Sequence, residues 1–303
     1  MIEQLQHASV GRPITKNGIA LHPVYLHGSS ATAVGFGHVI VEELGSASVP
    51  TLRATNPAAH PSVILEGELV FGGLQDRIIN STIIVPANSS IEVPVSCVEQ
   101  GRWSNEGSFS RSGRRATRRV RRSQIAGGLR TGGRTSDQGA VWESVRHELE
   151  RFRVSSQSGS LAAVTHRIDT TNPMASSGED RVLRAIREVT AMGPLPGQRG
   201  VVVTHGRRVV SAEVLSSTEH LASVWAGIVE SALVEAVDPT IRKGSPSSTS
   251  VLRFLKKLAE GDGTRSPGIG LGVEYTVETR GVIGRSIVLD DMLVHASAFA
   301  LAA

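Results

Sequence analysis

The segment between Val63 and Trp103 constrains the fold more than any other part of the chain. Three stretches in it are rich in β-branched and aliphatic residues and read as strands, namely residues 63–71, 77–85 and 91–99. A Gly72-Gly73 pair separates the first two stretches, and a polar loop over residues 86–90 separates the last two. Strands with such short connections predict an antiparallel meander, which is an element of a sandwich or a barrel. Gly67, inside the first stretch, indicates a bulge or a close approach of backbone.

The second half of the chain predicts helices mixed with further strands. Apolar residues recur at helical spacing in three ranges, which are 137–152, 179–192 and 221–236. Asp137 stands where a helix N-cap is expected. Extended segments are expected at residues 200–204, 208–215, 273–279, 283–289 and 293–298. Because strands and helices do not alternate regularly, the pattern favours the α+β class over a doubly wound parallel sheet.

Length and composition predict two domains or one large one. The chain has 303 residues, of which 40% are hydrophobic, and this is enough to bury a packed core. We expect a strand-rich, sandwich-like or barrel-like domain over residues 1–105 and an Arg-, Gly- and Ser-rich loop or linker over residues 106–136. A mixed α+β part follows over residues 137–303, either as a domain of its own or packed with the first part as one domain.

Cysteine content and hydropathy predict a soluble protein of a reducing compartment. The single cysteine excludes an intrachain disulfide and an all-cysteine metal site. No stretch approaches about 20 apolar residues, so no membrane span is expected. The first 20 residues lack the apolar run of a secretory signal. The cytoplasm is therefore the expected location.

Positive charge is concentrated in one segment. Nine of the 32 Lys and Arg residues lie between Arg111 and Arg134, where there is no acidic residue, and the rest of the chain is net acidic. Such a run is typical of nucleic-acid or polyphosphate binding. No aromatic residue is interleaved with the arginines, so stacking on bases has no support. The alternative interpretation, which we favour, is a solvated and disordered run of like charge.

The end of the meander predicts a functional site. Side chains two residues apart on a strand share a face, so Cys97 and Glu99 continue the apolar face formed by alternate residues from Ile91 onward. Glu66, Glu68 and Glu99 are candidates for general acid and base, or for ligands of Mg²⁺ or Ca²⁺. Cys97 is a candidate nucleophile. The ligand-binding candidates are three donors to a phosphate and one ring for stacking, namely Gln75, Arg77, Arg102 and Trp103.

Each of these candidates also has a structural interpretation. A buried cysteine is commonly a small hydrophobic residue, and a tryptophan beside a strand end is commonly part of the core. The strongest competing interpretation is an ion-pair lock, in which Arg77 or Arg102 pairs with Glu99 and fastens the strands together. The spacing of the residues does not separate these interpretations.

Several short motifs resemble a prokaryotic family named for its association with ADP-ribosylglycohydrolase and rhodanese-phosphatase proteins. The matching motifs are Leu65-Glu66-Gly67-Glu68, Gly73-Leu74-Gln75-Asp76-Arg77, Cys97-Val98-Glu99-Gln100-Gly101-Arg102-Trp103, Gln138 to Trp142, and His295 to Phe299. Asp76 stands where the family pattern has Asn, and the Arg run is heavier than is usual for the family. The resemblance implies a role in bacterial conflict or immune systems that handle NAD-derived or ADP-ribose nucleotides.

Two classes of function follow. The first is an enzyme that acts on a nucleotide through a carboxylate site, with a divalent cation as the one cofactor that these residues point to. The second is a non-enzymatic sensor or scaffold whose acidic and Arg residues form an ion-pair lock. An enzyme requires Glu66, Glu68 and Glu99 to converge on an open cavity, whereas a scaffold can pair them internally with arginines. The identity of the metal, the substrate and the oligomeric state are left open.

Overall fold

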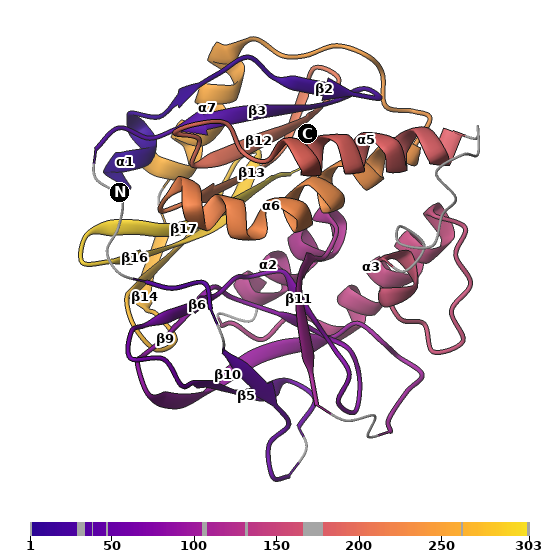
Figure 1. Ribbon diagram of the computed structural model, residues 1–303, viewed down its shortest axis with the longest axis vertical. Coiled ribbons are helices and arrows are strands. Elements are labelled where there is room, and N and C mark those ends of the chain that lie inside the picture. Colours follow the sequence, from indigo (N-terminus) through magenta and orange to yellow (C-terminus); the bar gives the residue numbers. More distant parts are fainter. Residues whose placement is uncertain are drawn as a thin grey trace. The chain divides into compact units, whose positions relative to one another are not determined.

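The computed structural model confirms an α+β fold and divides the chain into two compact units (Figure 1). The structure describes residues 2–28, 34–37, 39–46, 48–104, 108–130, 133–165, 178–261 and 263–301. Unit 1 consists of Met1–Ala33, Ser176–Gly268 and Gly272–Ala303, and unit 2 consists of Val34–Ala175 and Ile269–Leu271. The division therefore differs from the expected boundaries, because the first strands of the chain belong with its C-terminal half.

Unit 2 contains the predicted antiparallel meander. Its six-stranded sheet has the order β11-β7-β8-β10-β5-β4. The strands are β4 (Ile40–Glu42), β5 (Thr51–Asn56), β7 (Glu68–Phe71), β8 (Arg77–Ile79), β10 (Ser89–Cys97) and β11 (Ser110–Arg115). Their inward side chains form an apolar core that includes Val41, Leu52, Ile79 and Val93.

The first two predicted strands of the meander are each broken in two. Residues 63–71 form β6 (Ser62–Ile64) and β7, and residues 77–85 form β8 and β9 (Ile83–Val85). The first break follows from Gly67, whose φ of +78° lies outside the extended region. β6 and β9 pair with each other as a separate two-stranded sheet.

The Arg-rich segment is folded, so the expected loop over residues 106–136 is wrong. It forms the edge strand β11 and the helix α2 (Arg118–Arg130), which packs against α3 (Gln138–Arg151). Asp137 caps α3 as predicted, since its side chain accepts a hydrogen bond from the Ala140 amide. The charge run is tolerated because acidic side chains 29 to 55 residues away neutralise it; the ion pairs are Arg111–Glu68, Arg121–Glu66 and Arg119–Glu148. Nucleic-acid binding by this segment stays a prediction, with fewer free cations to support it.

Unit 1 is built on an antiparallel sheet of nine strands. The order is β1-β3-β12-β13-β17-β16-β15-β14, with β2 also paired to β3. The strands are β1 (Ser9–Val10), β2 (Ile14–Lys16), β3 (Ile19–Tyr25), β12 (Gly200–His205), β13 (Arg208–Leu215), β14 (Gly263–Pro267), β15 (Val273–Thr279), β16 (Val282–Leu289) and β17 (Met292–Ala300). β3 is buried along almost its whole length, which explains why it lies inside the sheet, beside β12.

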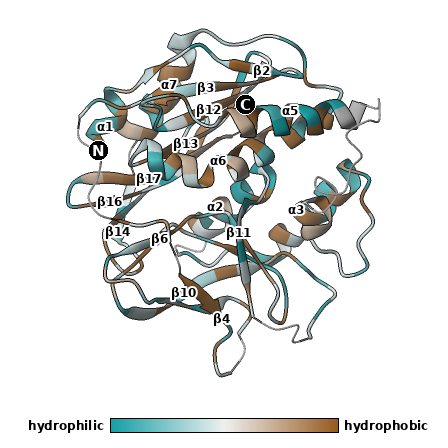
Figure 2. Cartoon of the chain, viewed as in Figure 1, coloured by the Kyte–Doolittle hydropathy of each residue, from teal (hydrophilic) through white to brown (hydrophobic). Residues whose placement is uncertain are grey.

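The helices of unit 1 are α1 (Glu3–Gln6), α5 (Gly178–Met192), α6 (Thr218–Leu233), the 3₁₀ turn η1 (Val234–Val237) and α7 (Ser248–Glu260). α5 and α6 pack against each other, and each carries both hydrophilic and hydrophobic residues (Figure 2). Within the described residues one segment, Thr218–Val237, is long and apolar enough to cross a membrane, and half of its most apolar window is buried. This is weak evidence for a span, because a core helix of a soluble protein passes the same test.

Candidate functional site

The motif from Cys97 to Trp103 begins at the last residue of β10 and continues as a tight turn. Glu99 pairs with Ser160 in an isolated β-bridge, and the Gly101 amide donates to the Ser158 carbonyl at 2.7 Å. A Cβ on Gly101 would lie 3.0 Å from the Cα of Ser158, so a side chain at this position would crowd the neighbouring backbone. The turn is therefore held between its own strand and the segment around residue 160.

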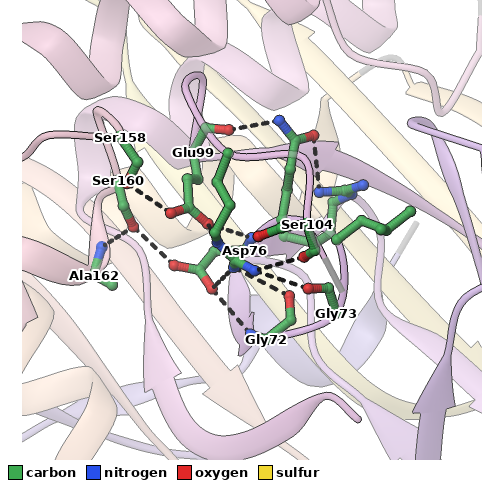
Figure 3. A network of polar contacts seen from close by, with 12 residues as sticks. Gly72, Gly73, Asp76, Glu99, Ser104, Ser158, Ser160 and Ala162 are labelled. Carbon is green, nitrogen blue, oxygen red and sulfur yellow. Dashed lines mark hydrogen bonds and ion pairs between the residues drawn. The ribbon is translucent and has the colours of Figure 1, made fainter. Parts of the chain in front are cut away.

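A largely buried polar network occupies this turn, and Figure 3 shows Asp76, Glu99, Ser158 and Ser160 in it. Arg102, whose side chain is 14% exposed, contacts both carboxylates of the network. Its Nε and Nη2 lie 2.8 and 2.6 Å from Glu99 Oε2, and its Nη2 lies 3.2 Å from Asp76 Oδ1. Arg102 also donates to the carbonyl oxygens of Gly73 at 2.8 Å and Gly72 at 3.3 Å. The guanidinium thus ties the end of β10 to the turn between β7 and β8.

Further donors surround the two carboxylates that Arg102 contacts. Ser158 Oγ donates to Glu99 Oε1 at 2.6 Å, and the Asp76 amide donates to Glu99 Oε2 at 3.0 Å. Ser160 Oγ donates to Asp76 Oδ2 at 2.8 Å, and the Gly72 amide donates to Asp76 Oδ1 at 3.0 Å (Figure 3). Every carboxylate oxygen of Glu99 and Asp76 therefore has a donor.

The two carboxylates differ in their pKa. Burial by itself raises the pKa of Glu99, but hydrogen bonds from Arg102, Ser158 and the Asp76 amide outweigh burial and hold this pKa below its usual range. At Asp76 burial is the largest effect and raises the pKa, and the neighbouring charge of Glu99 raises it further. The hydrogen bonds from Gly72 and Ser160 lower the pKa of Asp76 but do not outweigh burial. Glu99 is thus a poor proton acceptor, because its ionised form is the stabilised one.

Cys97 is buried at the end of β10 and hydrogen-bonded to its surroundings. Its side chain is fully buried, burial raises the pKa of its thiol, and Sγ donates to the Glu99 carbonyl at 2.9 Å. The backbone of Cys97 is clamped by the Gln138 side chain, whose Oε1 accepts from the Cys97 amide at 2.9 Å and whose Nε2 donates to its carbonyl at 2.8 Å. A thiol with a raised pKa carries little of the thiolate that nucleophilic attack needs.

Arg77 is buried without enough partners. The side chain is 0% exposed, and Nη1 donates to Gln75 Oε1 at 3.2 Å. Nε and Nη2 have no hydrogen-bond partner, and the Glu43 carboxylate lies 3.9 Å from Nη2 at its nearer oxygen. Burial lowers the pKa of this guanidinium. An arginine stays charged in proteins, so unused donors on a buried guanidinium are costly.

Trp103 lies over this arginine. The indole centroid is 5.9 Å from Arg77 Cζ, which is within the range of a cation–π contact. The side chain is nevertheless 54% exposed, so the expectation of a core tryptophan is wrong. The buried cation with spare donors thus has an exposed aromatic ring beside it.

Glu66 and Glu68 belong to separate ion pairs elsewhere in unit 2. Glu66 is 1% exposed and forms a bidentate pair with Arg121, in which Nε and Nη2 donate at 3.1 and 2.8 Å. Glu68 forms a second bidentate pair with Arg111, at 2.8 and 3.0 Å. Of the eight predicted site residues, six contribute to the cluster around the turn, namely Gln75, Arg77, Cys97, Glu99, Arg102 and Trp103. The three glutamates do not share one constellation, and each has its own arginine.

A family model covers residues 7–299 of the chain, that of the ARG and Rhodanese-Phosphatase-superfamily-associated Protein domain. The chain belongs to this family. The match confirms the resemblance read from the motifs, and the family name links the protein to ADP-ribosylglycohydrolase-associated systems. No curated protein and no solved structure matches the chain.

Sequence reasoning missed several residues that complete the cluster in this family member. Glu43 follows β4, and Ser158 and Ser160 lie in a Ser-rich stretch that reads only as a break between helices. No motif marks these residues, since each contacts the cluster across at least 31 residues of sequence. Asp76 could have been singled out, because it departs from the family pattern at the centre of a matching motif.

The described residues hold no metal-binding group of three or more His, Cys, Asp or Glu side chains. The carboxylates of the cluster are directed at Arg102, at hydroxyl groups and at backbone amides. A divalent cation at Glu99 would have to displace Arg102, because the guanidinium already contacts the carboxylate oxygen that would bind the metal. The carboxylates therefore do not fit the cation site that the sequence led us to consider.

Proposed function

We propose that the protein is a non-enzymatic binding module that senses an NAD-derived or ADP-ribose-type nucleotide in a bacterial conflict system. The family name supports the choice of ligand, because it links the protein to ADP-ribosylglycohydrolase-associated systems. The pairing of the three candidate catalytic carboxylates with arginines supports binding without turnover. The pairing of every candidate catalytic carboxylate with an arginine is the observation that carries the proposal.

A hydrolase of this kind needs a carboxylate that can accept or donate a proton near neutral pH. Glu66 and Glu68 are both engaged by bidentate arginines, and the pKa of Glu99 is lowered. Arg121 occupies both carboxylate oxygens of Glu66, and Arg111 occupies both of Glu68, so neither carboxylate has an oxygen left for a substrate. Glu99 is held in its ionised form, which removes its capacity to act as an acid. Cys97 offers no substitute, since burial raises the pKa of its thiol.

Two groups, in contrast, are available to bind a ligand. Arg77 has two guanidinium nitrogens without a hydrogen-bond partner, and Trp103 has an exposed ring beside them. Guanidinium groups bind oxygen acceptors, and aromatic rings stack on the flat bases of nucleotides. Arg77 and Trp103 are therefore the residues on which we place the nucleotide. Gln75 orients Arg77 through its Oε1, and Arg102 fixes the turn.

Calorimetric titration with ADP-ribose and with NAD tests the proposal, alongside chromatography of the same mixtures for products. We expect saturable binding with no turnover. Trp103→Ala is expected to weaken binding at least about fivefold, because stacking on a base typically contributes about 1 kcal/mol or more. Ile40→Ala is the matched control, since Ile40 is another exposed large side chain of unit 2, at 51%, and is expected to leave the affinity unchanged.

Two results would contradict the proposal. If neither nucleotide binds, or if Trp103→Ala binds as the native chain does, the module has another ligand or another site. If products form and their formation disappears in Glu99→Gln while the fold persists, the protein is an enzyme. In that case Glu99 acts in catalysis despite its ion pair.

A further inference from the structure

Arg77 and Glu43 form an ion pair that leaves both partners with unused hydrogen-bonding atoms. Arg77 Nη2 and Glu43 Oε1 are 3.9 Å apart, which is too far for a hydrogen bond. Oε1 is fixed at this distance because it accepts from the Leu74 amide at 3.1 Å. Glu43 Oε2 is buried and has no partner, as is also true of Arg77 Nε and Nη2. Two donors and one acceptor thus lie unused on neighbouring side chains.

The charges of these two side chains limit what can bind to them. A positive guanidinium by itself would select an anion, but the nearby carboxylate cancels its charge and repels a second anion. The unused atoms instead call for a neutral group that has an acceptor for Arg77 next to a donor for Glu43. A site with unpaired buried polar groups discriminates strongly in favour of a ligand that satisfies all of them.

Trp103 adds the requirement for a flat ring. Its indole lies over Arg77 and is 54% exposed, so it covers the guanidinium on one side and offers an open surface on the other. Arg77 is itself 0% exposed, so a ligand reaches it only when a side chain that covers it moves, and the half-exposed indole is one side chain that lies over the guanidinium. Arg102, the residue before Trp103, is anchored through its side chain to the carbonyls of Gly72 and Gly73, so we assign this movement to the Trp103 side chain.

We propose that the Arg77–Glu43 pair and Trp103 form a recognition site for a heteroaromatic ring whose edge carries an uncharged hydrogen-bond acceptor next to a donor. A carboxamide on a pyridine ring has this pattern, and so does the amino edge of adenine. The acceptor binds Arg77, the donor binds Glu43, and the ring stacks on Trp103. The inference rests on the proposed function and names the part of the nucleotide that is read.

Calorimetry with small fragments tests this site directly. The carboxamide arm compares nicotinamide with nicotinate, which keeps the acceptor but replaces the donor by a negative charge. The adenine arm compares adenosine with purine riboside, which lacks the amino group. We expect one of the two donor-bearing fragments to bind at least about tenfold more tightly than its partner, and the arm that responds identifies the ring.

Glu43→Gln is the discriminating variant, because it removes the repulsive charge and keeps the shape of the side chain. In this variant nicotinate is expected to approach the affinity of nicotinamide, provided that the carboxamide arm responds in the native chain. If the adenine arm responds, loss of the carboxylate acceptor is expected to reduce the preference for adenosine to below threefold. Trp103→Ala is expected to weaken binding of the preferred fragment at least about fivefold in either case.

Failure of this inference can be distinguished from failure of the proposed function. If NAD or ADP-ribose binds the native chain while neither fragment pair shows a preference, the nucleotide binds, but the Arg77–Glu43 pair does not recognise its ring, and this inference is wrong. If inorganic pyrophosphate competes with ADP-ribose and Glu43→Gln tightens that competition, Arg77 binds the phosphates, and the inference is wrong. If neither dinucleotide nor fragment binds, both proposals fall.

Discussion

The Glu66–Arg121 and Glu43–Arg77 pairs each join a carboxylate to a buried guanidinium in unit 2, but they are built in opposite ways. The first has two short hydrogen bonds, at 3.1 and 2.8 Å, and both side chains are at least 95% buried. The second is separated by 3.9 Å and leaves atoms of both partners unused. The first pair has a donor at each carboxylate oxygen and acts as part of the framework. The unused atoms of the second pair are the reason why we propose that it binds a ligand.

The same contrast separates the two halves of the predicted site. The three glutamates looked most like catalytic groups in the sequence, but in the fold each of their carboxylate oxygens already accepts a hydrogen bond. These glutamates are Glu66, Glu68 and Glu99. Arg77 looked like one of several donors, and it is the residue with donors to spare. Residue type alone does not distinguish a lock from a site, because the distinction depends on how many partners surround each group.

The largest effect is expected where the saturated pair is broken. Glu66→Gln removes the charge that neutralises Arg121 and should lower the free energy of unfolding by about 3 to 5 kcal/mol, since a buried cation then loses its counter-charge. Chemical denaturation followed by circular dichroism measures this loss. Glu92→Gln, at an exposed position of β10, is the control and should change stability by less than about 0.5 kcal/mol. A loss below 1 kcal/mol for Glu66→Gln would contradict the description of this pair as a lock.

Gly67→Ala should reach the same pair through the backbone. Gly67 has a φ of +78°, and an added Cβ would lie 2.4 Å from Arg121 Nε. We expect a loss of about 2 to 3 kcal/mol from left-handed strain together with displacement of Arg121. Gly113→Ala is the matched control, because its φ is +69° and nothing lies within 4 Å of the added Cβ, so it should show the strain alone. Equal losses in the two variants would mean that the close approach of Arg121 is unimportant.

Glu99→Gln should have a smaller effect that depends on pH. The folded-state pKa of Glu99 is lowered, so its ionised form stabilises the fold, and this contribution is lost as pH falls from its usual pKa through the folded one. Near neutral pH we expect a loss of about 1 to 3 kcal/mol, because Arg102 keeps its contacts with Gly73 and Asp76. The difference in the free energy of unfolding between the native chain and the variant should shrink as the pH falls through that acidic range. Unfolding curves between acidic and neutral pH test this, and a difference that grows on acidification would refute it.

Asp76→Asn is the opposite arm of the same pH experiment. The pKa of Asp76 is raised in the fold, so its protonated form is the favoured one, and stability is lost as pH rises from its usual pKa through the folded one. The asparagine variant lacks this loss. It should therefore gain relative to the native chain on passing upward through that window, in contrast to Glu99→Gln. Parallel pH profiles for the two variants would show that the two carboxylates are not distinguished as described.

The smallest effect on stability is expected at the unsaturated pair. Arg77→Met removes a buried cation that has one hydrogen bond and keeps most of the volume of the side chain. We expect the free energy of unfolding to fall by no more than about 1 kcal/mol, because Arg77 gives up a single hydrogen bond. The carboxylate left behind, Glu43, lies 3.9 Å away, is 20% exposed and keeps the Leu74 amide as a donor, so it loses less than a fully buried partner would. A loss as large as that of Glu66→Gln would mean that Arg77 is as much a structural residue as Arg121. The comparison of these two variants is therefore the sharpest test of the difference between the pairs.

Much of the local structure could be predicted from the sequence. The meander around Val63 to Trp103, the cap at Asp137 and the amphipathic helices follow from turn residues, short-range hydrogen bonding and the period of the apolar residues. The motif from Cys97 to Trp103 also located a real cluster, and six of the eight chosen residues contribute to it. These features depend on interactions between residues close in the chain, which a sequence displays directly.

The tertiary structure decided the rest. β3 pairs with β12, about 180 residues later, and Arg111 and Arg121 find their carboxylates 43 and 55 residues away, which turns an apparent loop into a strand and a helix. Whether a charged side chain is a lock or a site depends on the same long-range contacts. The sequence by itself determined which residues are charged and which local elements form. Only the fold determined which charges are neutralised, because the free-energy cost of burying a charge depends on the partners that packing places beside it.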